Sequence, residues 1–338
     1  MRIGVIGLGF MGSTHLKALA NIPGAQLAAV MDLDEKRLSG DLSGIQGNIG
    51  GPAQTMDFSG VGKYRSVAEM AGDASVDAVD VCLPTHLHAP VTIELLRAGK
   101  HVLVEKPMAL DGAACDAMAA EARRQGKILM VAQVLRFLEP YRILQNYLED
   151  GSLGPVRSAF FRRRCAVPGW GPWEFDSSKS GGGVFDLLIH DVDMCLHLFG
   201  RPRTVSAVGH EDMAHGIDNI LARFEYPEIG FVTVTGGWHH LGAYPFSMEF
   251  TVVGDGGVVE YSSAGRPPTL YRANGESRTP ELSGKDCYQA EIEYFLECCR
   301  TGIGPVLCPP ESSARSVKLA LLMLESRRRN GKAIACNL

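Results

Sequence analysis

The segment that most constrains the fold is residues 2–12, RIGVIGLGFMG, near the start of the chain. It opens with an apolar run that does not alternate with polar residues, as is typical of a strand buried on both faces. Gly7, Gly9 and Gly12 then follow in the spacing G-x-G-x-x-G. In this motif the first glycine permits a tight turn, the second lets the backbone approach a pyrophosphate, and the third lets the next helix pack closely on the strand. The segment therefore predicts a dinucleotide-binding strand–turn–helix unit.

The cofactor preference depends on Asp32, which ends the second predicted strand 20 residues beyond the last of these glycines. A carboxylate at this point binds the ribose 2′-hydroxyl of NAD and repels the 2′-phosphate of NADP. Lys36 and Arg37 are nearby cations that soften this preference. We therefore expect NAD as the cofactor, with NADP not excluded, and we expect Phe10 and Met11 to border it.

The pattern of predicted elements changes near residue 132. Before that point apolar strands alternate with helical segments, which is typical of a parallel sheet built from βαβ units. After it, strand follows strand with turn signals such as GDGG, which indicates a largely antiparallel sheet. We therefore predict an α/β protein, with a doubly wound parallel sheet in residues 1–131 and an α+β domain in residues 132–338. The last helix is expected to pack back on the first domain.

Composition and charge exclude several classes of function. The formal net charge is −5 and the isoelectric point is near 6.1, so the chain carries no electrostatic footprint for binding nucleic acid. No apolar run approaches the ~18 residues that a membrane-spanning helix needs. The nine cysteines include no C-x-x-C pair and fit reduced thiols better than a disulfide framework. We expect a cytoplasmic protein with no nucleic-acid or membrane partner.

Residues 181–200, GGGVFDLLIHDVDMCLHLFG, place titratable residues in a helix that is otherwise apolar. Such side chains are costly to bury unless they are paired or used. At 100° per residue, four of them fall within an arc of about 60°: Asp186, His190, Asp193 and His197. Asp191 points away from this face. Three interpretations stay open from these residues alone: acid–base chemistry on a substrate hydroxyl, a metal site with Asp186, His190 and Asp193 as ligands, and a structural network.

Further motifs connect the two halves of the chain to a known family. Residues 84–110, PTHLHAPVTIELLRAGKHVLVEKPMAL, contain Pro84, His88, the AGKHV run and the EKP triplet. The motifs that follow in order are RF at 136–137, GSLG at 151–154, GGG at 181–183 and the D-x-x-x-H-x-x-D run that begins at Asp186. Together with the N-terminal glycines, these motifs resemble the glucose-fructose oxidoreductase/inositol dehydrogenase family, often called Gfo/Idh/MocA, over nearly the whole chain.

The resemblance implies a Rossmann domain followed by a domain with a large, open, mostly antiparallel sheet, through which the chain would form a homodimer or homotetramer. It implies an NAD(H)-dependent dehydrogenase that transfers a hydride between nicotinamide and a secondary alcohol of a sugar or an inositol-like cyclic polyol. Two alternatives within the family are an NAD-dependent glycoside hydrolase and a non-catalytic NAD-binding sensor. The resemblance implies no resident metal.

The resemblance also assigns residues to the site. It implies a catalytic set of Lys106, Asp186 and His190, in which His190 accepts the proton while Lys106 and Asp186 position and polarise the hydroxyl; the sequence leaves open whether Lys106 or His190 takes the proton. Substrate contacts are expected from this set and from Arg136 and Trp173. The cofactor is expected to contact Gly7, Gly9, Phe10, Met11, Gly12, Asp32, Pro84, Thr85, His88, Glu105 and Lys106. The peptide bond before Pro107 is expected to be cis, and His197 is expected to be structural.

Overall fold

The computed structural model describes residues 1–45, 47, 55–168, 171, 173–240 and 242–338. The chain divides into two compact units: the first comprises Met1–Val134 and Lys285–Ala314, and the second comprises Leu135–Gly284 and Arg315–Leu338. Residues 285–314 fall in the predicted second domain, whereas their contacts group them with the first unit. None of the described helices has both the length and the apolar character that crossing a membrane requires.

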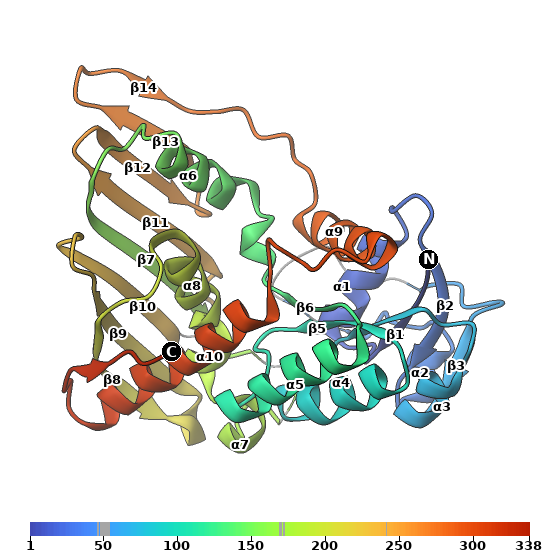
Figure 1. Ribbon diagram of the computed structural model, residues 1–338. Coiled ribbons are helices and arrows are strands. Elements are labelled where there is room, and N and C mark those ends of the chain that lie inside the picture. The colour runs from blue at the N-terminus through green and yellow to red at the C-terminus, as the bar shows by residue number, and fades with distance from the viewer. Residues whose placement is uncertain (46, 48–54, 169–170, 172, 241) are drawn as a thin grey trace. The chain divides into compact units, whose positions relative to one another are not determined.

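The first unit contains a six-stranded sheet in the order β3-β2-β1-β4-β5-β6, and every neighbouring pair is parallel (Figure 1). Its strands are β1 (Arg2–Ile6), β2 (Gln26–Met31), β3 (Gly62–Tyr64), β4 (Ala78–Val81), β5 (His101–Glu105) and β6 (Leu129–Ala132). Strands β1, β4, β5 and β6 are buried almost throughout, which explains why their sequences do not alternate. This strand order is that of a doubly wound Rossmann fold, so the predicted parallel sheet is confirmed.

Helices connect these strands, and one helix comes from far along the chain. The helices of this unit are α1 (Phe10–Leu19), α2 (Glu35–Leu38), α3 (Val67–Gly72), the 3-10 helix η1 (Thr85–Leu87), α4 (His88–Arg97), α5 (Gly112–Gln125) and α9 (Cys287–Thr301). Helix α9 packs against α1, where the Tyr288 ring lies 5.8 Å from the ring of His15. The strand order reverses between β1 and β4, and sheets of this kind bind ligands at the carboxyl ends of the strands beside such a reversal.

The second unit contains a nine-stranded sheet in the order β14-β13-β12-β11-β7-β10-β9-β8-β15. Its strands are β7 (Val156–Ala166), β8 (Thr204–Asp212), β9 (Ile217–Glu225), β10 (Phe231–His240), β11 (Ser247–Gly254), β12 (Gly257–Ser262), β13 (Arg266–Arg272), β14 (Ser277–Arg278) and β15 (Ile334–Ala335). Neighbours are antiparallel except β7 and β10, which are parallel. The predicted mostly antiparallel sheet is therefore confirmed.

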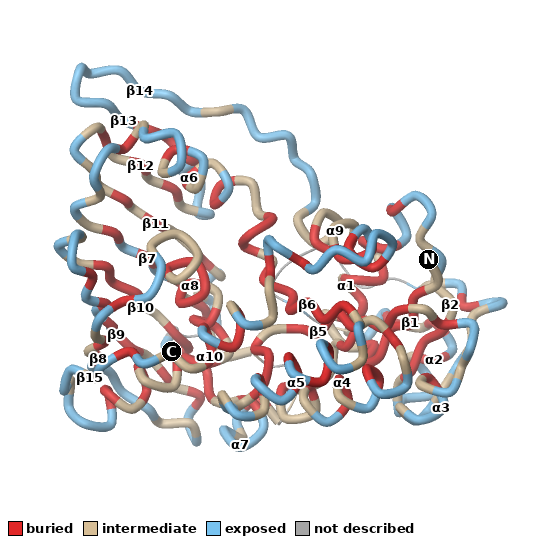
Figure 2. Tube along the Cα trace, viewed as in Figure 1, coloured by how far each residue is buried: buried red, intermediate tan, exposed pale blue. Residues whose placement is uncertain are grey.

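Helices of the second unit pack on one face of this sheet. The helices are η2 (Val134–Arg136), α6 (Glu139–Glu149), α7 (Ser177–Ser180), α8 (Gly183–Phe199), η3 (Met213–His215) and α10 (Pro310–Arg328), of which η2 and α10 begin in the first unit. Residues along β7 and β9 alternate between buried and more exposed positions (Figure 2). On β7, Phe161 and Arg163 are buried whereas Phe160 and Arg162 are exposed. Helix α8 covers the buried face, where it contacts β7, β9 and β10.

The glycines before α8 allow a close approach to its neighbours. Gly182 has a φ of +93°, and a Cβ there would lie 2.8 Å from Asp218 Oδ2. The same oxygen accepts a hydrogen bond from the backbone N–H of Val184 at 2.8 Å, so Asp218 holds the first turn of α8. A Cβ at Gly183 would lie 2.4 Å from the buried ring of Trp238. The absence of side chains in the GGG motif therefore lets α8 pack closely against β9 and β10.

We expect Gly183→Ala to lower the free energy of unfolding by about 1–3 kcal/mol, because the added methyl group overpacks against Trp238. Gly72→Ala is the matched control, since a Cβ at Gly72 meets nothing within 4 Å in the described chain. It should leave stability unchanged or raise it by less than about 1 kcal/mol. Urea unfolding followed by circular dichroism measures both variants, and equal stabilities would contradict the steric argument.

Candidate active site

The glycine-rich turn lies between β1 and α1 at the carboxyl edge of the first sheet. Two of its glycines are sterically required: a Cβ at Gly7, whose φ is +87°, would lie 2.4 Å from Cys82 O, and a Cβ at Gly12 would lie 1.8 Å from Gly7 O. A Cβ at Gly9 meets no described atom within 4 Å, so this side of the turn is open. No side chain caps the start of α1 in the described chain, and its first turn holds no acidic residue. These features fit a pyrophosphate at the helix N-terminus.

Asp32 follows β2 and is tied to the glycine-rich turn. Its Oδ2 accepts a hydrogen bond from Leu8 N at 2.7 Å, and its Oδ1 accepts one from Asp34 N at 2.9 Å. Arg37 Nη1 lies 3.5 Å from the same Oδ2. An ionised carboxylate has about four lone-pair sites, so these bonds leave capacity for ribose hydroxyls. The geometry fits the expected role of Asp32.

His88 links the loops that follow β4 and β5. Its side chain is buried, and its two ring nitrogens lie 2.7 Å from Leu83 O and 2.7 Å from Pro107 O. Both nitrogens are thus directed at backbone carbonyls, which favours a loop-holding role over the predicted contact with the cofactor. Pro84 precedes η1, and Thr85 is buried at its first position.

Lys106 follows the last residue of β5, and its side chain is partly exposed. The Lys106–Pro107 peptide bond is cis, as predicted. Glu105 is buried, and its Oε2 accepts a hydrogen bond from the backbone N–H of Lys106 at 2.9 Å. Its Oε1 lies 3.1 Å from His15 Nε2. Burial favours the neutral carboxyl, but His15 and then Lys106 hold the pKa of Glu105 below its usual range, so Glu105 is ionised.

A buried polar cluster behind Lys106 escaped the sequence reasoning. Its members are the buried residues His15, Asp80, Glu105 and Glu291 and the partly exposed Cys82. The signal for it was present in the sequence, since Asp80 lies inside the apolar strand VDAVDV. Ligand atoms of His15, Asp80 and Cys82 lie within 4.8 Å of one another. These groups already bind one another, since His15 Nδ1 lies 2.8 Å from Asp80 Oδ2 and the Cys82 thiol donates to Asp80 Oδ1 at 3.5 Å, so they fit a hydrogen-bonded network.

In the second unit, Asp186 and His190 lie one turn apart on α8 and are both partly exposed. The residues between them, Leu187, Leu188 and Ile189, are buried. The predicted polar face of this helix thus contains these two side chains. A carboxylate one turn before a histidine can orient the imidazole and favour its cationic form.

Two other acids of α8 are engaged in buried ion pairs. Asp193 binds Arg136, with Oδ1 2.7 Å from Nη2 and Oδ2 2.8 Å from Nε, and Ser316 Oγ donates to the same Oδ1 at 2.8 Å. Asp191 binds Arg163, with Oδ2 2.7 Å from Nε. The metal interpretation therefore loses its third ligand, because Asp193 is occupied. The same pair favours a packing role for Arg136 over the predicted substrate contact.

Two candidates remain, Trp173 and His197, and His197 lies near the C-terminal end of α8. Trp173 is half-buried in the turn that precedes α7. His197 is partly buried and lies 3.3 Å from Gln145 Oε1, which fits the predicted structural role. Burial, followed by the charge of Arg136, lowers the pKa of His197. Trp170, which shares the segment PGWGPW with Trp173, lies outside the described residues.

Two family models match the chain. The model described as the oxidoreductase family with an NAD-binding Rossmann fold matches residues 1–133, and the model of the GFO/IDH/MocA C-terminal domain matches residues 141–260. Together they cover the first sheet, and β7–β11 with most of β12 in the second sheet. The NAD-binding description agrees with the cofactor expected from the glycine-rich turn.

Individual proteins are similar over most of the chain. Myo-inositol 2-dehydrogenase of Thermotoga maritima is 28% identical over 341 residues, which cover 96% of this chain and 94% of the relative. The 1,5-anhydro-D-fructose reductase of Ensifer adhaerens is 36% identical over 254 residues, which cover 70% of this chain and 74% of the relative. The crystal structure of a probable dehydrogenase from Thermotoga maritima superposes with a TM-score of 0.80 at 25% identity and covers 99% of each chain.

The buried cluster predicts a pH dependence of stability that Glu291 controls. Glu291 on α9 is fully buried, and its carboxyl oxygens have no hydrogen-bond partner among the described residues. Burial raises the pKa of this carboxyl well above its usual range. The folded state therefore keeps a proton that the unfolded chain releases above about pH 4.3, and the stability contributed by Glu291 falls as the pH rises toward the folded-state pKa.

Glu291→Gln removes this proton uptake, so its Tm relative to the unsubstituted protein should be higher at pH 8 than at pH 5. Thermal unfolding followed by circular dichroism at both pH values measures the difference. Glu293→Gln is the control on the same helix, because the hydrogen bond from Lys285 lowers the pKa of Glu293 and predicts no gain at pH 8. A Tm difference for Glu291→Gln that is the same at both pH values would refute the assignment.

Proposed function

This chain belongs to the GFO/IDH/MocA oxidoreductase family, and on that premise we propose that it is an NAD(H)-dependent dehydrogenase acting on a secondary alcohol of a sugar or cyclic polyol. The observation that carries the proposal is the carboxyl edge of the first sheet. There an open glycine-rich turn and Asp32 provide a dinucleotide cradle, and Lys106 follows β5 at the same edge. The relatives named for inositol and anhydrofructose chemistry support this substrate class.

The cofactor would be held by backbone and side chains of the first unit. The N–H groups of the first turn of α1, which begins at Phe10 and Met11, would bind the pyrophosphate, and Asp32 would bind the ribose hydroxyls. Pro84, Thr85 and Glu105 border the same edge at the ends of β4 and β5. Bound NAD supplies the nicotinamide that accepts or donates a hydride.

The alcohol proton requires a base, because oxidation of a secondary alcohol releases a hydride and a proton. In this proposal His190 accepts the proton, since histidine titrates near neutral pH. Asp186, one turn away on α8, orients the imidazole, and the Lys106 ammonium polarises the same hydroxyl. Trp173 contributes an apolar surface for the ring of the substrate. Arg136 supports α8 through Asp193.

We expect Lys106→Ala to lower kcat by about 100-fold or more, because the hydroxyl loses its cationic partner. The affinity for NADH, measured by fluorescence titration, should change less than about twofold. Turnover is followed by NADH absorbance with a panel of polyols, sugars and nucleotide sugars, each with NAD and with NADP. Lys63→Ala, an exposed lysine on β3 of the same sheet, is the control. A fully active Lys106→Ala enzyme would remove Lys106 from the mechanism.

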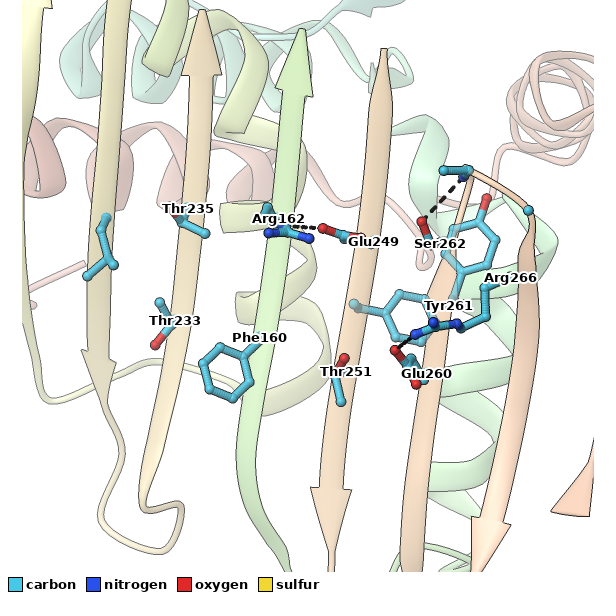
Figure 3. Close-up of a pocket in the computed structure, with 14 residues that line it drawn as sticks. Phe160, Arg162, Thr233, Thr235, Glu249, Thr251, Glu260, Tyr261, Ser262 and Arg266 are labelled. Atoms are coloured by element: carbon cyan, nitrogen blue, oxygen red, sulfur yellow. Dashed lines mark hydrogen bonds and ion pairs between the residues drawn. The ribbon is translucent and has the colours of Figure 1, made fainter. Parts of the chain in front are cut away.

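We also propose that a second copy of the chain covers the exposed face of the second sheet, giving a homodimer or a larger homo-oligomer. Apolar side chains stand on this face, including Phe160, Leu221 and Tyr271, each more than 40% exposed. Arg162 pairs with Glu249 on the same face (Figure 3). Figure 3 shows Phe160, Arg162 and Glu249 on neighbouring strands along one hollow of the sheet, which Leu221 also lines. Monomeric proteins rarely expose contiguous apolar surface of this kind, and one face repeated by symmetry gives a closed assembly.

Leu221→Glu should weaken self-association by about tenfold or more, since it places a charge on β9 beside Val208 of β8 and Thr235 of β10. Size-exclusion chromatography with light scattering over a range of concentrations measures the change. Val306→Glu is the control, because Val306 is 77% exposed and belongs to the first unit. A monomeric unsubstituted protein would overturn the proposed interface.

A further inference from the structure

We propose that His15 is a positioning residue for Lys106 and that it acts through the carboxylate of Glu105. The proposal rests on the proposed catalytic role of Lys106. It concerns side chains of the first unit alone, and neither the glycine motif nor the EKP motif assigns a role to His15.

Two hydrogen-bonding contacts and one ion pair connect these residues in a chain. His15 lies on α1 and is fully buried, and its Nδ1 lies 2.8 Å from Asp80 Oδ2 on β4. Its Nε2 lies 3.1 Å from Glu105 Oε1 at the end of β5. The other oxygen of Glu105 accepts the backbone N–H of Lys106 at 2.9 Å. One carboxylate therefore lies between the buried imidazole and the backbone of the lysine.

The groups that face His15 favour its doubly protonated form. They come from β4 and the residue that follows it, from β5 and from α9: Asp80, Cys82, Glu105, Tyr288 and Glu291. Burial alone would lower the pKa of His15, but Asp80 foremost among its neighbours raises it well above the usual value. An imidazolium has an N–H on each ring nitrogen: Nδ1 hydrogen-bonds Asp80, whereas Nε2 meets Glu105 as an ion pair outside hydrogen-bond geometry.

Loss of the imidazolium would leave Glu105 as a buried carboxylate without its main counter-charge. Such a group takes up a proton or turns toward another donor, because an unpaired buried charge is costly. Either response changes the acceptor that holds the Lys106 backbone N–H. Because a small misplacement of a reacting group can cost about 100-fold in rate, the lysine is sensitive to this support.

The two ring contacts can be separated by substitution. In His15→Asn the side-chain amide reaches the position of Nδ1 and can still bind Asp80, but it cannot reach Glu105. In His15→Gln the longer side chain places its amide near the position of Nε2, facing Glu105. We therefore expect His15→Asn to disturb Lys106 and His15→Gln to restore much of its behaviour, which a general loss of packing would not do.

The first measurement needs neither substrate nor NAD. Competitive labelling with acetic anhydride over a range of pH, read by peptide mass spectrometry, gives the reactivity of Lys106 relative to Lys63 in the same sample. His15→Asn should change this ratio by about threefold or more, and His15→Gln should return it toward the unsubstituted value. His101→Asn is the matched control, since His101 lies at the opposite end of β5 and accepts a hydrogen bond from Ile128 N.

The second measurement is steady-state kinetics with NAD and myo-inositol, or with the most active member of the substrate panel. His15→Asn should lower kcat about 10- to 100-fold, with the KM for NAD within about twofold. If His15→Asn does not fold by circular dichroism, Asp80→Asn is used in the same assays. It removes the counter-charge of His15 and should shift Lys106 labelling in the same direction.

The outcomes separate this inference from the proposed function. Unchanged Lys106 labelling in folded His15→Asn, or in Asp80→Asn where that variant is used, overturns the positioning role whatever Lys106→Ala does. An equal change in His101→Asn overturns it too, because the effect would then be general to β5. A shift in Lys106 labelling together with an active Lys106→Ala enzyme leaves the positioning role intact and refutes the catalytic role of the lysine instead.

Discussion

A carboxylate buried in a protein interior must be paired, and helix α8 carries two of them into the core of the second unit. Asp191 and Asp193 each meet an arginine through short contacts, while Asp218 binds the first turn of the helix from β9. These partners are specific in direction as well as in charge, because a guanidinium presents its donors in a fixed fork. The rotation and depth of α8 are thereby fixed, and with them the placement of Asp186 and His190 on its less buried side.

Helix periodicity predicted which direction each acid of α8 faces, but it did not predict which of them are buried. Spacing alone placed Asp193 on the same face as Asp186 and His190, and it separated Asp191 from them. In the structure Asp191 and Asp193 are both buried, each paired with an arginine from another element. Arg163 lies in the run RRRC at residues 162–165, where alternation along β7 turns it inward between the exposed Arg162 and the half-buried Arg164. A helical wheel records direction but carries no information about what packs against each side.

The sequence predicted the fold better than it predicted the buried contacts that hold the site residues in place. Non-alternating apolar strands separated by helices require a buried parallel sheet, and the glycine spacing identifies its ligand-binding edge, so the first unit followed from local patterns. The association of α9 with α1 did not, since it joins segments more than 260 residues apart and leaves no local periodic signal. For the same reason the buried cluster around His15 escaped prediction. Its members come from α1, β4, β5 and α9, which only the folded sheet brings together.

Helix α1 determines the position of both the glycine-rich turn and the residues around Lys106 in the first unit. The Cβ that Gly12 lacks would collide with the carbonyl oxygen of Gly7, so α1 packs at a depth that no other residue type would allow. His15 lies three residues further along the same helix, and this depth brings its imidazole within reach of Glu105. The glycine spacing that opens the turn to a dinucleotide therefore also sets the position of the side chain that holds the end of β5. Packing and hydrogen bonding fix both parts of the site on rigid elements, which is the condition for holding a reactive group in register with its cofactor.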